Sequence, residues 1–165
     1  SGKVHIAENN KHVFTATPGN VFGEHSVLMG SLRNCTALCA NGCVVQELQG
    51  KDFRQLVQTT PEILTSLRDL CMRREFKKAV VLRLKKEFPY DNPRKAFDAV
   101  KSKNSRDDRL DFRAIAKLMR ELNPDYTDEE IVEIMNTIDL ANSGAVSFDE
   151  FKKVFVADIR KSASV

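Results

Sequence analysis

The sequence predicts an α+β chain of 165 residues, in which a small antiparallel sheet with following helices precedes an all-helical part. Short segments with alternating apolar residues, separated by turn dipeptides, occupy residues 1–58, as is typical of strands. From residue 60 the apolar residues recur every three to five positions, which indicates helices. Two prolines mark a linker at 89–93, so we expect one domain at 1–88 and a second at 94–160.

The strands of the first part follow from alternation and turn residues. Val4 and Ile6 alternate with polar neighbours, which is the pattern of a half-buried strand. Further strands are expected at 13–16, 35–40 and 43–48, and the hairpin dipeptide Asn41-Gly42 separates the last two. Because the strands are short and the turns are close together, we expect part of an antiparallel barrel or sandwich.

Two helices are expected to follow these strands. The first is short, at 51–57, and the second is long, at 61–88. Thr60 offers an N-cap, and Pro61 suits the first helical position. Because the second span is long for one helix in a small domain, we expect a bend near residues 72–75.

The second part predicts four helices, at 94–100, 112–122, 128–138 and 149–160. Thr127 and Glu130 form a capping-box pattern at the start of the third helix. Four helices with loops between partners indicate a pair of helix-loop-helix units.

Gly23, Glu24 and Arg33 form the first candidate site. A short helix at 25–29 would present unpaired backbone N–H groups to an anion. An arginine ten residues after the glycine can fold back and make a forked contact with the same phosphate. A carboxylate cannot bind phosphate, but it can accept hydrogen bonds from sugar hydroxyls. The three residues therefore predict a site for an anion that carries a sugar.

This segment resembles the cyclic-nucleotide-binding domain, a family that carries F-G-E, a short helix and then R-x-A-[ST] before the next strand. The match runs from Phe22-Gly23-Glu24 to Arg33-Asn34-Cys35-Thr36 and continues through 44–48 and 51–57. The resemblance implies that Glu24 binds the ribose 2′-hydroxyl and that Arg33 pairs with the cyclic phosphate. Backbone amides of Gly23, Glu24, Asn34 and Cys35 would complete the cradle. The implied fold is an antiparallel β-roll or jelly-roll, with residues 61–88 as the two helices that follow it.

The resemblance covers only the second half of that domain, from residue 1 to about residue 88. We therefore expect a partial roll with open strand edges, which favours a homodimer through those strands. Asn34 stands where the family often has Thr or Ala, and Cys35 where it usually has Ala, so the choice between cyclic AMP and cyclic GMP stays open. Two alternatives also stay open: a vestigial site, and a turn glycine beside an ordinary surface ion pair.

Residues 139–150 form the second candidate site, a twelve-residue loop between two predicted helices. A calcium loop needs oxygen ligands at positions 1, 3, 5, 7, 9 and 12, and glycine at position 6. Gly144 stands at position 6, whereas Ala141 at position 3 has no side-chain oxygen. The remaining positions hold Asp139, Ser143, Ala145 with its backbone carbonyl, Ser147 and Glu150.

The loop and its flanking helices resemble the EF-hands of the calmodulin superfamily, over residues 94–157. The first hand is degenerate, with Lys101 at the first ligand position and Ala114 at the closing acid, so we expect no calcium there. We expect its aspartates, Asp107, Asp108 and Asp111, to be solvated. The second loop keeps two carboxylates, so weak calcium binding and a structural loop paired through Leu110 and Val146 both stay open.

Charge and composition exclude several classes of protein. The net charge of +3 divides into +5 for residues 1–90 and −2 for 91–165, with no basic stripe of interleaved aromatics that would indicate nucleic-acid binding. No apolar run approaches the length of a membrane span. The four cysteines lack metal-site spacing and fit a reducing, cytoplasmic compartment. No Ser/His/Asp or Cys/His arrangement indicates an enzyme.

The sequence therefore predicts a regulatory sensor segment of a larger signalling protein. It would bind a cyclic nucleotide, and calcium weakly or not at all, to control a channel, kinase or exchanger. Its expected partners are these ligands, the output domain of the parent chain and a second copy. The alternative is a protein-interaction module with both sites vestigial, in which the helical pair offers a groove to a partner helix.

Overall fold

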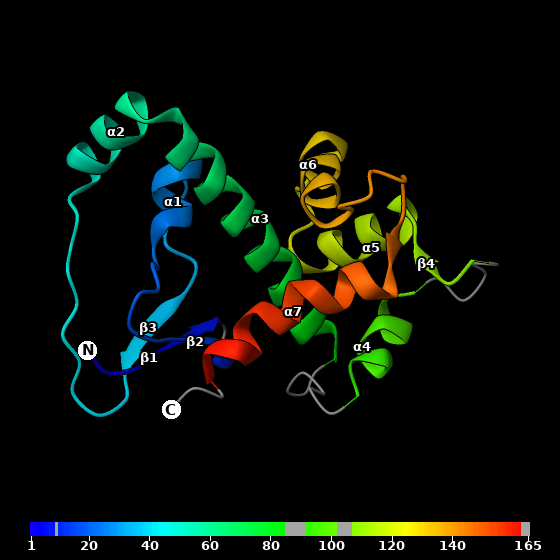
Figure 1. The fold of residues 1–165 in the computed structure, drawn as a ribbon, viewed down its shortest axis with the longest axis horizontal. Coiled ribbons are helices and arrows are strands. Elements are labelled where there is room, and N and C mark those ends of the chain that lie inside the picture. The colour runs from blue at the N-terminus through cyan, green and yellow to red at the C-terminus, as the bar shows by residue number, and fades with distance from the viewer. Residues whose placement is uncertain (9, 85–91, 102–106, 163–165) are drawn as a thin grey trace. The chain divides into compact units, whose positions relative to one another are not determined.

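The computed structural model describes residues 1–8, 10–84, 92–101 and 107–162 (Figure 1). It combines helices with a small antiparallel sheet, which confirms the α+β class. Packing divides the chain into two compact units, Ser1–Cys71 and Met72–Val165. The predicted linker at 89–93 lies mostly outside the described residues, and the division by packing falls earlier, within the long helix α3. No helix in the described ranges has both the length and the apolar character needed to cross a membrane.

The first unit contains a three-stranded antiparallel sheet of order β2-β1-β3. Its strands are β1 (Val4–Glu8), β2 (Lys11–Ala16) and β3 (Thr36–Cys39), close to three of the predicted spans. Val4 lies opposite both Ala16 and Cys39, and the register shifts after Ile6. Val4, Ile6 and Ala16 form a small buried cluster, as the alternation predicts.

The predicted strand at 43–48 is wrong, because these residues form no strand. Val44 exchanges two backbone hydrogen bonds with Ser1, of 2.9 and 3.0 Å, and its side chain remains 74% exposed. A strand needs a neighbour along its whole length to satisfy its backbone groups, and the described residues supply that neighbour only at Ser1. The sheet is therefore three-stranded, and a β-roll or jelly-roll stays a prediction.

Three helices accompany the sheet: α1 (Glu24–Met29), α2 (Gly50–Thr59) and α3 (Pro61–Leu84). The short helix expected at 51–57 is confirmed in α2. Helix α3 is continuous through residues 72–75, and the bend expected there stays a prediction. Residues 85–88 of the predicted helix lie outside the described residues.

The second unit adds four helices to the end of α3, and all four predicted helices are confirmed. They are α4 (Pro93–Val100), α5 (Phe112–Leu122), α6 (Asp128–Ile138) and α7 (Phe148–Ser162). The Thr127–Glu130 capping box is present with both of its hydrogen bonds. Asp111 caps α5 by accepting a 2.8 Å hydrogen bond from the backbone N–H of Ala114.

A single apolar core holds the second unit together. Phe97 of α4 and Phe151 of α7 are fully buried and meet edge to face, with ring centroids 5.3 Å apart. Between the helices, β4 (Arg109–Leu110) pairs with β5 (Val146–Ser147). Leu110 lies opposite Val146, and both are fully buried, which confirms the predicted link between the two loops.

Candidate functional site

Arg33 folds back onto Gly23, as the ten-residue spacing predicts. Its Nη1 donates a hydrogen bond to the Gly23 carbonyl at the N-terminal end of α1. Gly23 has φ +81°, and a Cβ there would lie 3.0 Å from the same nitrogen. The positive φ favours glycine at this position, and a Cβ there would also crowd the guanidinium.

Glu24 is buried rather than open. The residue is only 6% exposed. Its Oε1 accepts a hydrogen bond from the Cys71 thiol, with 3.8 Å between oxygen and sulfur. The sequence predicts Cys71 only as an apolar helix residue, and no local pattern links it to Glu24, because the contact spans 47 positions.

Asn34 and Cys35, the other predicted members of this site, lie between Arg33 and β3. Both are exposed and belong to no helix or strand. The structure thus brings together Gly23, Glu24 and Arg33 at one turn, with Asn34 and Cys35 following directly along the chain.

The second site is a closed loop in which Asp139 organises the first half. Asp139 Oδ1 accepts hydrogen bonds from the Ser143 backbone N–H at 3.0 Å and hydroxyl at 3.2 Å. Oδ2 accepts one from the Gly144 N–H at 2.7 Å. Asp139 is 5% exposed, so the loop's own donors replace the water it loses on burial.

Glu150 closes the second half of the loop. Its Oε1 accepts from the Ala141 N–H at 2.9 Å, and its Oε2 accepts from the Ser147 N–H at 2.8 Å and hydroxyl at 2.6 Å. Burial raises the pKa of this carboxyl, but the hydrogen bonds from Ser147 and Ala141, with the charge of Arg109, outweigh that effect. The pKa of Glu150 therefore lies below its ordinary value.

An arginine from the first hand reaches the second loop. Arg109 Nη1 donates to the Ser143 hydroxyl at 3.0 Å. The single proton of this hydroxyl can be donated either to Asp139 Oδ1 or to the Ala145 carbonyl, 2.9 Å away. No motif in the sequence pointed to the contact of Arg109 with Ser143. The strand pairing could have indicated it, because Arg109 lies opposite Ser147 in the register of β4 and β5.

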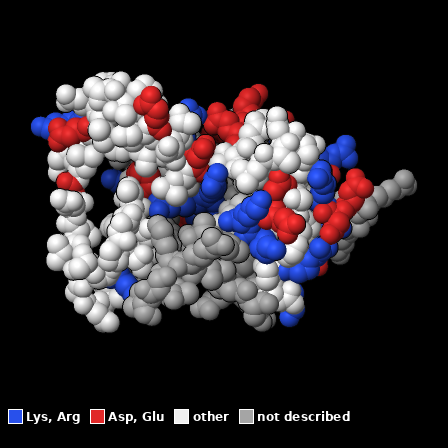
Figure 2. Space-filling model, in the orientation of Figure 1, with Lys and Arg blue, Asp and Glu red and all other residues white. Residues whose placement is uncertain are grey.

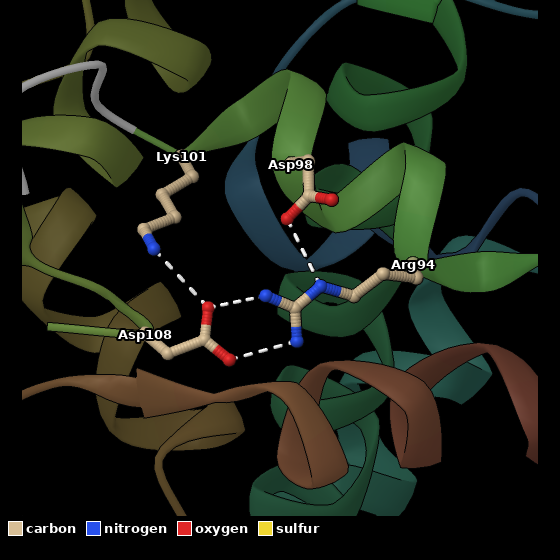
Figure 3. A network of polar contacts seen from close by, with 4 residues as sticks. All are labelled: Arg94, Asp98, Lys101 and Asp108. Carbon is tan, nitrogen blue, oxygen red and sulfur yellow. Dashed lines mark hydrogen bonds and ion pairs between the residues drawn. The ribbon is translucent and has the colours of Figure 1, made fainter.

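The described residues of the first hand carry an ion network (Figure 3). Arg94 forks onto both carboxylate oxygens of Asp108, and Lys101 reaches the same carboxylate at 3.1 Å. Arg94 also contacts Asp98 at 3.0 Å. These hydrogen bonds lower the pKa of Asp108 and raise that of Arg94. The prediction that Asp108 is only solvated is therefore wrong, because it is paired with Arg94 and Lys101. The same prediction is wrong for Asp111, because its side chain caps α5.

The loops differ in what they could hold. Loop 139–150 offers hard oxygen donors of the kind calcium prefers, but it has no ligand at position 3. Within the described residues, no group of three or more His, Cys, Asp and Glu side chains is placed to hold a metal ion.

Basic and acidic side chains are interspersed on the face shown in Figure 2, over the described part of the surface.

Two helix-loop-helix units joined through a short strand pair define an EF-hand pair. The family model described as an EF-hand domain pair matches residues 94–156, which span α4 to α7. No curated protein and no solved structure matches the chain. Residues 94–156 are therefore similar to an EF-hand domain pair, which suggests a calcium-binding regulatory role for this part of the chain.

Proposed function

We propose that the chain is a regulatory sensor segment that binds a cyclic nucleotide through Gly23, Glu24, Arg33, Asn34 and Cys35. The observation that carries the proposal is the return of Arg33 to the carbonyl of Gly23, the residue directly before Glu24 at the start of α1. A guanidinium held there by a neutral carbonyl can exchange this partner for a phosphate, which it binds more strongly because the contact is charge-assisted.

Glu24 would accept the ribose hydroxyl. Its carboxylate already accepts a weak hydrogen bond from the Cys71 thiol, so a hydroxyl would replace a poorer donor. Cyclic AMP and cyclic GMP share the ribose and the cyclic phosphate, and the proposal covers both.

Calcium would bind loop 139–150 weakly in this proposal, through Asp139, Ser143, the Ala145 carbonyl, Ser147 and Glu150. The carboxylates would have to release hydrogen bonds that they already accept from the loop. The sensor would act on an output domain of the parent chain, such as a channel, kinase or exchanger, and would have no catalysis of its own.

The test is a thermal-shift panel of the whole chain with cyclic AMP, cyclic GMP, calcium and a chelator. A ligand that binds only the folded state raises the melting temperature. Arg33→Ala should abolish the nucleotide shift, whereas Arg54→Ala, at an exposed arginine of the same unit, should leave it unchanged. Absence of any shift with either nucleotide at millimolar concentration would contradict the proposal.

A second copy of the chain is the proposed partner of the sheet edges. Strands β2 and β3 lie at the two edges, and apolar Leu38 on β3 is 55% exposed. Unpaired edges with exposed apolar side chains favour pairing with another strand. Light scattering at several concentrations tests this point, and a mass that stays monomeric throughout would exclude it.

The second candidate function is a protein-interaction module with both ligand sites vestigial. One observation favours it: Asp139 and Glu150 are already satisfied by donors of their own loop. A chain that shows no thermal shift with nucleotide or with calcium, yet stays folded, would favour this candidate.

A further inference from the structure

The second half of α3 is part of the EF-hand core. Met72, Phe76, Ala79 and Val80 are each at most 5% exposed and belong to the same buried cluster as the apolar residues of α4 to α7. Phe76 meets Phe151 of α7 edge to face, with ring centroids 5.9 Å apart. Figure 1 shows this end of α3 crossing α7. The apolar positions follow the i, i+4, i+7, i+8 spacing of a helix that lies on an apolar surface.

Polar contacts fix the position of α3 on this surface. Tyr126, in the loop between α5 and α6, donates from its hydroxyl to Glu75 Oε2 at 2.9 Å. Lys78 pairs with Glu75 Oε1 at 2.9 Å, and both residues are buried, at 3% and 8% exposure. Buried charges are tolerated only where they are paired and hydrogen-bonded, so a shift of the helix along its axis would leave them unsatisfied.

Arg83, eight residues after Glu75 along α3, makes a second set of contacts. Its Nε donates to the Ala99 carbonyl at 3.0 Å, and its Nη1 pairs with Glu121 at 2.9 Å. The two sets of contacts lie at Glu75 and Arg83, eight residues apart, and therefore define both the register and the direction of the helix.

From these contacts we propose that residues 72–84 are a resident target helix. The EF-hand pair of this chain recognises its own α3, and an external amphipathic helix with the same apolar spacing binds only by displacing it. This inference goes beyond the proposed function, because it holds whether or not the chain binds a nucleotide or calcium.

The covalent connection makes the resident helix a strong competitor. Residues 85–92 join α3 to α4, so the helix remains close to its surface even when it is released. A short tether of this kind acts as an effective concentration in the millimolar range. The apparent affinity of an external helix falls by the fraction of molecules in which the surface is open.

The test uses the whole chain and a fluorescent peptide of residues 66–84, followed by anisotropy. The wild-type chain should bind the peptide weakly. Phe76→Ala weakens the docking of α3 but keeps its helix propensity, so this chain should bind the wild-type peptide at least about tenfold more tightly. Arg73→Ala is the matched control on an exposed position of the same helix and should bind the peptide like wild type.

Equal binding by the wild-type and Phe76→Ala chains, or no binding by a folded Phe76→Ala chain, would overturn the proposal. If circular dichroism shows that the variant is unfolded, hydrogen exchange on the wild type decides. An undocked helix exchanges rapidly, because isolated helices are marginal in water. Amides of residues 76–80 that exchange as slowly as those of α5 support docking, whereas exchange as fast as in residues 62–68 overturns it.

Discussion

At the scale of single residues, basic side chains stand where the two EF-hand loops would otherwise face a cation. In the loop of the first hand, loop 1, Lys101 stands at the position aligned with the first ligand and pairs with Asp108. In the loop at residues 139–150, loop 2, Arg109 donates to Ser143, which stands at position 5. A guanidinium at a ligand oxygen both occupies that oxygen and repels a divalent ion. Arg109 should therefore lower the calcium affinity of loop 2.

We expect Arg109→Gln to strengthen calcium binding by about fivefold, because it removes one unit of repulsion worth roughly 1 kcal/mol near the surface. Calorimetric titration at fixed ionic strength measures the change, in an Ala141→Asp background if wild-type binding is too weak. Arg113→Gln, at an exposed position of α5, makes the same change in net charge. If both variants bind calcium equally, the effect comes from net charge and not from the contact with Ser143.

Ala141→Asp should strengthen calcium binding in loop 2, because it supplies the missing position-3 ligand and a negative charge together. Glu150→Gln should weaken it, since it removes one of the two carboxylates that stand at ligand positions. Calcium titration of each variant tests both expectations. The control is Leu140→Asp, which adds the charge at a residue that is 58% exposed and occupies no ligand position. A folded Ala141→Asp chain that binds no better than Leu140→Asp would show that the loop is purely structural.

At the scale of the elements, the start of α5 depends on the side-chain cap from Asp111. Loss of an N-cap hydrogen bond costs about 1 kcal/mol, so Asp111→Ala should lower the free energy of unfolding by that amount. Urea denaturation followed by circular dichroism measures the change. Asp125→Ala removes a carboxylate from an exposed loop position and should have little effect. Equal losses in both variants would exclude the cap as the cause.

The helices of the EF-hand pair were predictable because each has a helical apolar spacing of its own, and α5 and α6 also begin at side-chain caps. Thr127 and Glu130 lie three residues apart and form the capping box within one turn. The strand expected at 43–48 failed for the opposite reason, because strand formation depends on partners elsewhere in the chain. The β-branched residues Val44 and Val45 favour a strand, but they give no information about whether such a partner exists.

The candidate sites divide in the same way. Spacing alone suggested that Arg33 returns towards Gly23 and that residues 139–150 form one loop, and both contacts are present, while the binding of a ligand at either place stays a prediction. The contacts of Glu24 with Cys71 and of Glu75 with Tyr126 join residues 47 and 51 positions apart. Such contacts arise only when whole helices pack together, so no local sequence pattern predicts them.

At the scale of the whole molecule, loop 2 links stability to pH. The folded pKa of Glu150 lies below its ordinary value of 4.5, so the unfolded chain binds a proton more readily. Glu150 therefore contributes stability that is fully present above about pH 4.5 and is lost as the pH falls through the folded pKa. Glu150→Gln should reduce the acid-induced fall of the melting temperature below that pH, whereas Glu129→Gln, at an exposed site, should not. Identical melting profiles for the two variants would contradict this linkage.

The position of residues 72–84 has a practical consequence for work on the EF-hand pair alone. The family match begins at residue 94, which invites an expression fragment that starts there. Such a fragment would lack Phe76 and Val80, both fully buried in the core, and would expose the aromatic surface around Phe151 to water. Apolar surfaces of this kind promote self-association. Binding of peptides to that fragment would then report a surface that the intact chain keeps covered, and a fragment that begins near residue 66 is the appropriate one to prepare.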